Sequence, residues 1–368
     1  MPKSTPIGCF DYNLPPGSVA QHPLEPRSAA RLLDASGPNP VHRRVSDLPG
    51  LVGAGDVVVV NETRVHPGRL LLVKPTGGVV EVLLVEELTG SGSGPEWEAL
   101  VRPSRRVPPG TVLLDGPGGS PALEVGPPTV ESPLQPYIKE AHLGSSDPAP
   151  SHSPDGGLRL VRLIDPMIVD RVGQMPLPPY IHEPLADPER YQTVYAKAPG
   201  SVAAPTAGLH LTEEVLSACM ANGASIQRVD LSVGLGTFRP ITAAKVEDHA
   251  MHSERYRVPK ETLEACREAR RVLAVGTTTL RALESAAATG CLQGRTSLYI
   301  HGDFSFLVVD VLLTNFHLPR SSLLVLLESF YGPGWRELYK LAAEQGYRFA
   351  SFGDAMLVAR RNHTKEAS

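Results

Sequence analysis

Several histidines and one aspartate in the C-terminal half of the chain have the chemistry needed for proton transfer. Histidine changes its charge near neutral pH, and a carboxylate can accept or return a proton at an enzyme site. Each of these side chains could also be an ordinary hydrogen-bonded loop residue, and their types do not separate a base from an acid. The residues predicted to be catalytic are His210, His317, His252 and Asp354.

The spacing His249-x-x-His252, followed by Glu254, raises the question of a metal site. Histidine and carboxylate are common ligands of zinc and related metals. A third strong ligand is not fixed by the spacing, however. We therefore predict no metal here and assign these side chains to hydrogen bonding or substrate contact.

Four short segments near the histidines are rich in glycine, threonine, asparagine and arginine. Glycine lets the backbone approach a ligand closely, and the N–H groups at a helix start bind carboxylate or phosphate. Alternatively, a threonine of 277–279 only caps a helix, Arg281 only pairs with Glu284 one turn away, and Tyr180 packs in the core instead of stacking on a base. The residues predicted to bind substrate are Thr206, Gly208, Gly234, Gly236, Thr237, Arg239, Thr277, Thr278, Thr279, Arg281, Asn315 and Tyr180.

The elements that position these segments follow from their apolar flanks. Strands are predicted at 201–205, 226–233, 272–276 and 308–314. Helices follow three of them, with N-caps at Thr212, at one threonine of 277–279 and at Ser321. Alternating strands and helices favour a largely parallel sheet, whose strand-to-helix loops all emerge on one face. We therefore expect a barrel-like α/β catalytic domain with the four polar segments around one cavity.

The periodicity changes between residues 61 and 165 and predicts a small antiparallel β-barrel inserted into the α/β domain. Segments 69–73 and 79–85 flank Thr76-Gly77-Gly78, and segments 96–101 and 111–114 flank Pro108-Pro109-Gly110, as in hairpins. Residues 115–157 are rich in Pro, Gly and Ser, a composition that predicts mobile loops. The densest basic set is either a solvated face or a set of nucleic-acid phosphate contacts. It comprises Lys74 and the five arginines predicted to contact the nucleic acid, which are Arg64, Arg69, Arg102, Arg105 and Arg106.

The composition excludes other classes of protein. Lysine and arginine number 35 against 39 acidic residues, so the chain lacks a general basic field and would hold nucleic acid only through a local patch. The four cysteines have no CxxC spacing and are expected to be reduced, as in a cytoplasmic protein. Apolar runs are too short for a secretion signal or a membrane span. Gly234-Leu-Gly236 is too short for a dinucleotide-binding fingerprint.

Ten short motifs, in their order along the chain, closely resemble the S-adenosylmethionine:tRNA ribosyltransferase-isomerase family of queuosine biosynthesis. Each motif alone is weak, whereas their number and order are specific. They cover nearly the whole chain except about 115–157. The motifs are Phe10-Asp-Tyr-Asn-Leu-Pro, Gln21-His-Pro-Leu-Glu-Pro-Arg27, Asn61-Glu-Thr-Arg64, Pro176-Leu-Pro-Pro-Tyr-Ile181, Tyr191-Gln-Thr-Val-Tyr195, Ala204-Pro-Thr-Ala-Gly-Leu-His210, Val233-Gly-Leu-Gly-Thr-Phe-Arg-Pro240, His249-Ala-Met-His-Ser-Glu254, Thr314-Asn-Phe-His-Leu-Pro319 and Ser351-Phe-Gly-Asp-Ala-Met356.

The resemblance implies a reaction on 7-aminomethyl-7-deazaguanine at the wobble position of a tRNA with a GUN anticodon. The ribosyl group of S-adenosylmethionine moves to the amine, giving epoxyqueuosine and releasing adenine and methionine. The donor is a co-substrate, and no bound cofactor, metal or obligate protein partner is expected; a monomer is the default. The resemblance also implies an α/β barrel paired with a small β-barrel domain. This agrees with the limits predicted from the periodicity, with a catalytic domain at 1–60 and 166–368 and the inserted barrel at 61–165.

Two other functions remain open from the sequence. A conventional RNA methyltransferase would release S-adenosylhomocysteine instead of adenine and methionine. A non-catalytic tRNA-binding protein would use the barrel as its platform and would not need His210 or His317. The polar segments that follow the strands favour an enzyme, because a passive binder needs no polar cavity there.

Overall fold

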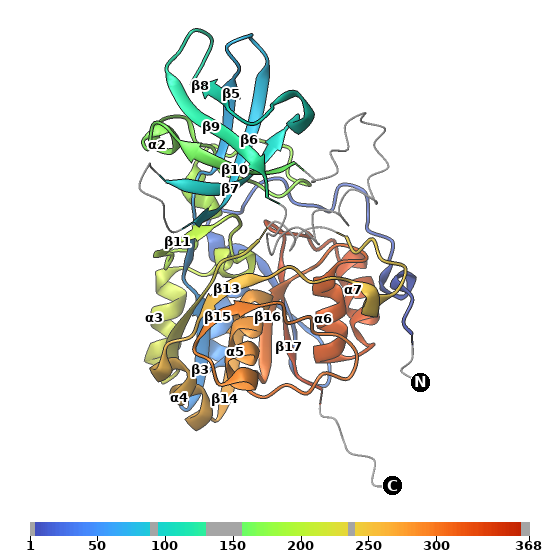
Figure 1. Ribbon diagram of the computed structural model, residues 1–368. Coiled ribbons are helices and arrows are strands. Elements are labelled where there is room, and N and C mark those ends of the chain that lie inside the picture. Colours follow the sequence, from blue (N-terminus) through green and yellow to red (C-terminus); the bar gives the residue numbers. More distant parts are fainter. Residues whose placement is uncertain (1–3, 89–94, 130–156, 235–239, 362–368) are drawn as a thin grey trace.

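The computed structural model describes residues 4–88, 95–129, 157–234 and 240–361. A small barrel of strands stands above a larger body in which helices cover a sheet (Figure 1). The chain enters the barrel after β3 (Asp56–Asn61) and β4 (Thr63–Val65), and it returns to the larger body after β10 (Leu158–Leu163). The prediction of an α/β protein with an inserted antiparallel β-barrel is confirmed.

Nine strands form the large sheet, in the order β15-β13-β12-β3-β14-β16-β17-β1-β2. Its four central strands, β12, β3, β14 and β16, are parallel to one another, whereas β17 runs antiparallel to β16. The order ends in β15 and β2, so this sheet is open, and the closed ring is the inserted barrel. Strands not yet given have these bounds: β1 (Arg31–Ala35), β2 (Val41–Arg44), β12 (Ser225–Leu231), β13 (Glu254–Arg257), β14 (Arg271–Val275), β15 (Gln293–Thr296), β16 (Val311–Asn315) and β17 (Ala355–Ala359).

Strand β3 is a central strand that the four predicted strand-and-loop units did not include. Its sequence Asp-Val-Val-Val-Val-Asn is buried throughout, as expected for a parallel strand covered on both faces. The first predicted strand, in contrast, does not join the large sheet. Strand β11 (Ala198–Ser201) pairs with β4 in a separate two-stranded sheet, and residues 202–205 form no strand. That part of the prediction is wrong, because proline and glycine in the Ala-Pro-Gly-Ser segment give few ladder hydrogen bonds.

The main helices begin and end close to where the sequence places them. Thr212 Oγ1 accepts a hydrogen bond from Val215 N at the start of α3 (Glu213–Ala221), and Ser321 caps α6 (Ser322–Tyr331). The expected threonine cap of α5 (Thr277–Thr289) is wrong: Gly276 is the N-cap, and no side chain caps this helix. The remaining helices and 3-10 turns are α2 (Ile168–Val172), α4 (Lys260–Glu268), α7 (Trp335–Glu344), η1 (Ile7–Phe10), η2 (Arg27–Ala29), η3 (Val45–Leu51), η4 (Ser104–Arg106), η5 (Pro188–Tyr191), η6 (Thr206–His210) and η8 (Val246–Asp248).

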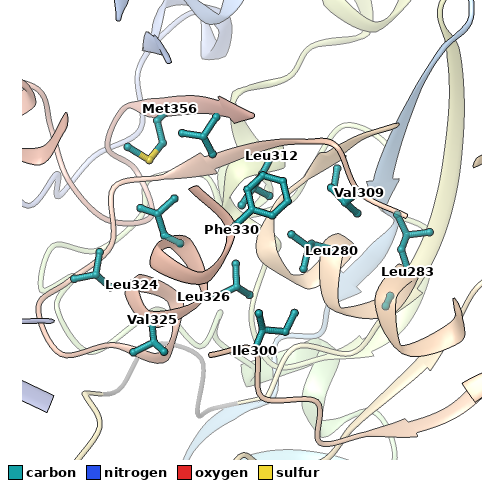
Figure 2. Packing of buried hydrophobic residues seen from close by; sticks show 14 of the residues in the cluster. Leu280, Leu283, Ile300, Val309, Leu312, Leu324, Val325, Leu326, Phe330 and Met356 are labelled. Carbon is teal, nitrogen blue, oxygen red and sulfur yellow. The ribbon is translucent and has the colours of Figure 1, made fainter. Parts of the chain in front are cut away.

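Helices α5 and α6 are fixed against the sheet by a shared apolar core. Leu280 and Leu283 of α5, Leu312 of β16 and Phe330 of α6 belong to one buried cluster (Figure 2). All four side chains are fully buried. Burying a side chain of this size contributes roughly 1.5–3 kcal/mol, so the packing holds the start of α5 firmly at the end of β14.

The inserted barrel closes in the order β10-β7-β6-β5-β8-β9. The predicted hairpin of β5 (Arg69–Val73) and β6 (Val79–Leu88) is confirmed. The second predicted hairpin is wrong, because β7 (Glu96–Arg102) pairs with β6 and β10, whereas β8 (Thr111–Leu114) pairs with β5 and β9. The connection through η4 is long enough to cross the barrel.

The segment expected to form only mobile loops contains a barrel strand. Strand β9 (Pro121–Pro128) buries Ala122, Leu123 and Val125 in the apolar core of the barrel, and this burial overrides the Pro and Gly content of its surroundings. Residues 130–156 lie outside the described residues. In the described ranges no helix is both long and apolar enough to span a membrane. The four cysteines are all free thiols, as predicted.

Candidate functional site

A pocket opens where the central parallel strands end. The empty space in and around it is about 310 Å³, open solvent included. Three of the four expected segments share it through Thr206, the start of α5 and Asn315, and the fourth reaches it through Val233, next to Gly234. Predicted substrate residues outside the described ranges are Gly236, Thr237 and Arg239. The pocket is lined by Ala204, Pro205, Thr206, Ala207, Val233, Gly276, Thr277, Thr278, Thr314, Asn315, His317 and Leu323.

Asn315, the last residue of β16, links three of the pocket's segments. Its Oδ1 accepts a hydrogen bond from Thr206 Oγ1 at 2.9 Å, and its Nδ2 donates to His210 Nε2 at 2.9 Å and to the carbonyl oxygen of Asp354 at 3.4 Å. Because a carbonyl oxygen can only accept, the amide nitrogen must be the atom that faces it. His210 Nε2 is therefore an acceptor, which puts the proton of the neutral ring on Nδ1.

His210 lies behind Asn315 and does not line the pocket. Burial lowers its pKa to about 3, and the nearby Arg348, Arg27 and Arg190 act in the same direction. The ring is therefore neutral at pH 7. His210 therefore orients the Asn315 side chain directly, and it acts on the pocket only through Asn315.

His317 does line the pocket, and two tyrosines hold its backbone. Tyr12 donates to the His317 carbonyl oxygen at 2.6 Å, and His317 N donates to the Tyr339 hydroxyl oxygen at 2.8 Å. Its Nε2 is paired with Thr314 Oγ1 at 3.0 Å. Nδ1 has no partner among the described residues, yet it is not sealed from solvent, so this nitrogen is open to a ligand. Burial lowers the pKa of His317 to about 3, which keeps the ring neutral at pH 7.

The first turn of α5 forms another wall of the pocket. Gly276 has a φ of 89°, a value that favours glycine, and this turns the chain from β14 directly into the helix. Thr279 Oγ1 donates to Val275 O at 2.6 Å and so points into the fold. Thr278 Oγ1 accepts from Asn61 Nδ2 at 3.3 Å. Of the three threonines in this turn, Thr277 and Thr278 line the pocket.

A buried ionic cluster lies beside this wall. Glu254 Oε1 accepts from Gly234 N at 2.9 Å and contacts His252 Nε2 at 2.8 Å, and Oε2 is paired with Arg281. Burial acts to raise the pKa of Glu254, but Arg281 and His252 outweigh it and lower that pKa well below the ordinary value. The cluster thus joins α5 to Gly234.

The expected pairing of Arg281 with Glu284 is wrong. Glu284 instead accepts hydrogen bonds from the backbone N–H groups of Leu307, Val308 and Val309. Arg281 turns towards β13 because Glu254 supplies a buried counter-charge there. Among the described residues, no group of three or more His, Cys, Asp or Glu side chains is placed to hold a metal ion.

Three further predicted site residues lie outside the pocket lining. Both carboxylate oxygens of Asp354 accept backbone hydrogen bonds, from Arg31 N at 2.9 Å and Arg348 N at 2.8 Å. Tyr180 is half-buried, and its hydroxyl lies 2.7 Å from Ser351 Oγ. A Cβ atom on Gly208 would lie 2.1 Å from the Tyr195 hydroxyl oxygen, so this glycine is required for packing.

The arginines predicted to contact nucleic acid differ in their surroundings. Arg64 is paired with Glu189 at 2.6 Å, and Arg69 with Glu81 at 2.8 Å. Arg102, Arg105 and Arg106 follow one another at the end of β7 and in η4, and all three are exposed. This second group therefore presents the more accessible positive charge on the barrel.

Two functional candidates were missed at the sequence level. Asn61 is fully buried at the end of β3, where its side chain bonds Leu231 N and O at 3.0 Å as well as Thr278. Tyr12 clamps the His317 backbone from the N-terminal segment. Both residues stand inside quoted motifs, so their signal was present, but their partners are 170–305 positions away.

The fold and site define a class of protein: an α/β protein with a neutral polar pocket at the ends of its parallel strands and an inserted β-barrel. A family model described as "Queuosine biosynthesis protein" matches residues 7–358, and the chain belongs to that family.

Relatives of nearly equal length support this assignment. The chain is 48% identical to the S-adenosylmethionine:tRNA ribosyltransferase-isomerase of Rubrobacter xylanophilus, over 95% of this chain and 96% of the relative. It is 46% identical to the protein of the same name from Thermus thermophilus, over 96% and 99%. The crystal structure of S-adenosylmethionine tRNA ribosyltransferase from Thermotoga maritima matches with a TM-score of 0.50 and 31% identity, over 95% of this chain and 99% of that one.

Proposed function

We propose that the protein is an S-adenosylmethionine:tRNA ribosyltransferase-isomerase. It moves the ribosyl group of S-adenosylmethionine onto the amine of 7-aminomethyl-7-deazaguanine at the wobble position of a GUN-anticodon tRNA. The products are tRNA bearing epoxyqueuosine, adenine and methionine. The names of the relatives support this reaction, and the pocket at the strand ends supports an enzyme.

The observation that carries the proposal is His317, a neutral histidine that lines the pocket and whose Nδ1 has no partner among the described residues. A sulfonium group acidifies the protons on the adjacent ribose carbon, so a neutral imidazole placed there can accept one of them. The depressed pKa of His317 keeps the ring neutral through the physiological pH range, and Nδ1 is the basic nitrogen in the tautomer whose Nε2 donates to Thr314 Oγ1. We assign the general base to His317.

The other predicted catalytic residues then act through the pocket wall. His210 orients Asn315, whose Oδ1 is held by Thr206. Glu254 accepts from Gly234 N and is itself held by His252, so the two side chains fix the position of Gly234. Asp354 fixes the backbone beside Asn315 through its two accepted N–H groups. These are positioning roles, which fits the burial of all four side chains.

The barrel is proposed to hold tRNA. Arg102, Arg105 and Arg106 give a local basic group on a chain whose net charge is −4, so they can attract phosphates without a general basic field. The enzyme is further proposed to be a cytoplasmic monomer that needs no bound cofactor. To contact tRNA, Arg64 and Arg69 would have to leave their ion pairs with Glu189 and Glu81 and bind phosphate instead.

The test is a product analysis with precursor-bearing tRNA and S-adenosylmethionine. We expect free adenine and methionine in equal amounts, and S-adenosylhomocysteine in their place would instead establish a methyltransferase. His317→Ala should lower the rate of adenine release about 10²- to 10⁴-fold, which is the usual contribution of one proton transfer to the rate. Binding of tRNA without donor turnover, unchanged in His317→Ala, would establish the non-catalytic alternative.

His317→Gln provides the matched control, because it keeps a polar side chain of similar size without a basic ring nitrogen. Activity near the wild-type level in this variant would remove His317 as the base. A circular-dichroism melt of both variants separates loss of chemistry from loss of fold.

A further inference from the structure

The first turn of α5 contains buried hydrogen-bond donors that the protein itself leaves unpaired. The first backbone N–H groups of any helix have no partner within the helix. The usual remedy is a Ser, Thr, Asn or Asp side chain at the N-cap, but here the N-cap is Gly276 and no cap hydrogen bond forms. Within the described part of the chain, no other group accepts from the N–H groups of Thr277, Thr278 or Thr279.

The Thr277 side chain gives a second, independent sign of a ligand. It is 6% exposed and lines the pocket. Its hydroxyl has no hydrogen-bond partner among the described residues, and its oxygen is not one of the sealed, unpaired atoms. The two neighbouring threonines differ, since Thr278 Oγ1 accepts from Asn61 and Thr279 Oγ1 donates to Val275 O. A buried hydroxyl that is left unpaired and open to a pocket is placed to bond a ligand.

The charge of this end of the pocket favours an anion. The N-terminus of a helix carries a partial positive charge, and α5 has 13 residues. The described lining residues include no aspartate or glutamate that would compete for these donors. Its polar members are threonines, Asn315 and the neutral His317. A small anionic group therefore has donors at α5 and no repulsion opposite them.

We propose that the start of α5 binds the α-carboxylate of the methionine part of S-adenosylmethionine, through the Thr277 hydroxyl and the free N–H groups. This inference rests on the proposed function and adds the orientation of the donor in the pocket. With the carboxylate at α5, the sulfonium and ribose extend across the pocket towards Nδ1 of His317. The helix end thereby places the carbon next to sulfur beside the general base.

A phosphate of the tRNA is the competing ligand, and the burial of the site argues against it. Thr277 and Thr278 are both buried, and the pocket around them is small. A nucleic-acid backbone would have to enter the fold to reach them, whereas a terminal carboxylate reaches them as the narrow end of a small molecule.

Decarboxylated S-adenosylmethionine tests the proposal, because it retains the sulfonium, ribose and adenine and lacks only the carboxylate. We expect kcat/KM for adenine release to be about 10- to 100-fold lower with this donor, the range expected when hydrogen bonds to a charged group are lost. Thr277→Val removes the hydroxyl at nearly constant shape. This variant should lower kcat/KM for S-adenosylmethionine several-fold or more and leave kcat/KM for the decarboxylated donor nearly unchanged. The ratio of the two kcat/KM values should therefore be smaller than in the wild type.

Thr279→Val is the matched control, since it lies in the same turn but its hydroxyl faces away from the pocket. It should lower the melting temperature and leave the ratio of the two donors unchanged. Equal use of both donors by the wild type, or an unchanged ratio in Thr277→Val, would overturn the assignment. Equal use of both donors together with weaker tRNA binding by Thr277→Val would show a phosphate at this helix end.

Failure of the proposed function can be recognised separately. If neither donor yields adenine, calorimetry with L-methionine and methioninol still tests the site without turnover. The carboxylate site is supported if the wild type binds L-methionine more tightly than methioninol, and if this preference is reduced in Thr277→Val and kept in Thr279→Val. It is rejected if the wild type binds both compounds equally or binds neither.

Discussion

Replacing Glu254 by Gln should destabilise the protein more than its single lost charge suggests. The Glu254 side chain is 1% exposed and its partner Arg281 is 4% exposed, so neither can turn to water. Glutamine keeps the volume and one acceptor oxygen but leaves the guanidinium without a counter-charge. Removing one partner of a buried ion pair costs about 3–5 kcal/mol. At roughly 2 °C per kcal/mol, the melting temperature should fall by about 6–10 °C.

The effect should depend on pH in a defined direction. The folded-state pKa of Glu254 is depressed, so the carboxylate contributes stability above its unfolded pKa of about 4.5 and loses it as the pH falls below that value. The difference between wild type and Glu254→Gln should therefore be full at pH 7 and shrink below pH 4.5. Urea unfolding at pH 7, 5 and 4 measures this difference.

Two further variants decide the cause. Glu254→Gln combined with Arg281→Met removes both charges and should be more stable than Glu254→Gln alone. Glu189→Gln breaks the exposed pair with Arg64, in which the glutamate side chain is 60% exposed, and should cost less than about 1 kcal/mol. A buried, uncompensated Arg281 charge is refuted as the cause if Glu254→Gln lowers the free energy of unfolding no more than Glu189→Gln does. It is also refuted if adding Arg281→Met to Glu254→Gln destabilises the protein further.

Two other predictions follow from charge. Arg102→Gln and Arg106→Gln should each weaken tRNA binding and reduce the slope of log affinity against log salt by about 0.7–0.9, measured by filter binding, whereas an unchanged slope would place the tRNA elsewhere. The depressed pKa of His210 means that the unfolded chain binds a proton between pH 6.5 and about 3 that the folded protein does not, so stability falls as the pH falls through that window. From pH 7 to 5 this single histidine should account for about 2 kcal/mol of lost stability in urea unfolding, and His210→Gln should lose correspondingly less; equal losses would contradict the neutral buried ring.

Signals that act over a few residues were sufficient to predict many elements. Thr212 and Ser321 cap their helices because the bond spans three positions, and β5 and β6 pair because a tight turn joins them. Strands β14 and β16 were visible as apolar runs. The order of ten short motifs also indicated the family, since order along a chain needs no knowledge of its fold.

Partners distant in the sequence could not be read in this way. The wrong pairing of β7 with β8, and of Arg281 with Glu284, both came from choosing the nearest candidate along the chain. The open helix start at Gly276 was hidden because a threonine cap and a glycine cap look equally plausible in sequence.

The sequence by itself therefore determined many of the elements, the class of fold and the family, because these depend on local pattern and motif order. Only the tertiary structure decided which polar residues face a common pocket. It placed His317 in the lining and His210 behind Asn315, although the two histidines look alike in sequence. The physical reason is that burial and hydrogen-bond partners are set by packing between segments more than a hundred residues apart.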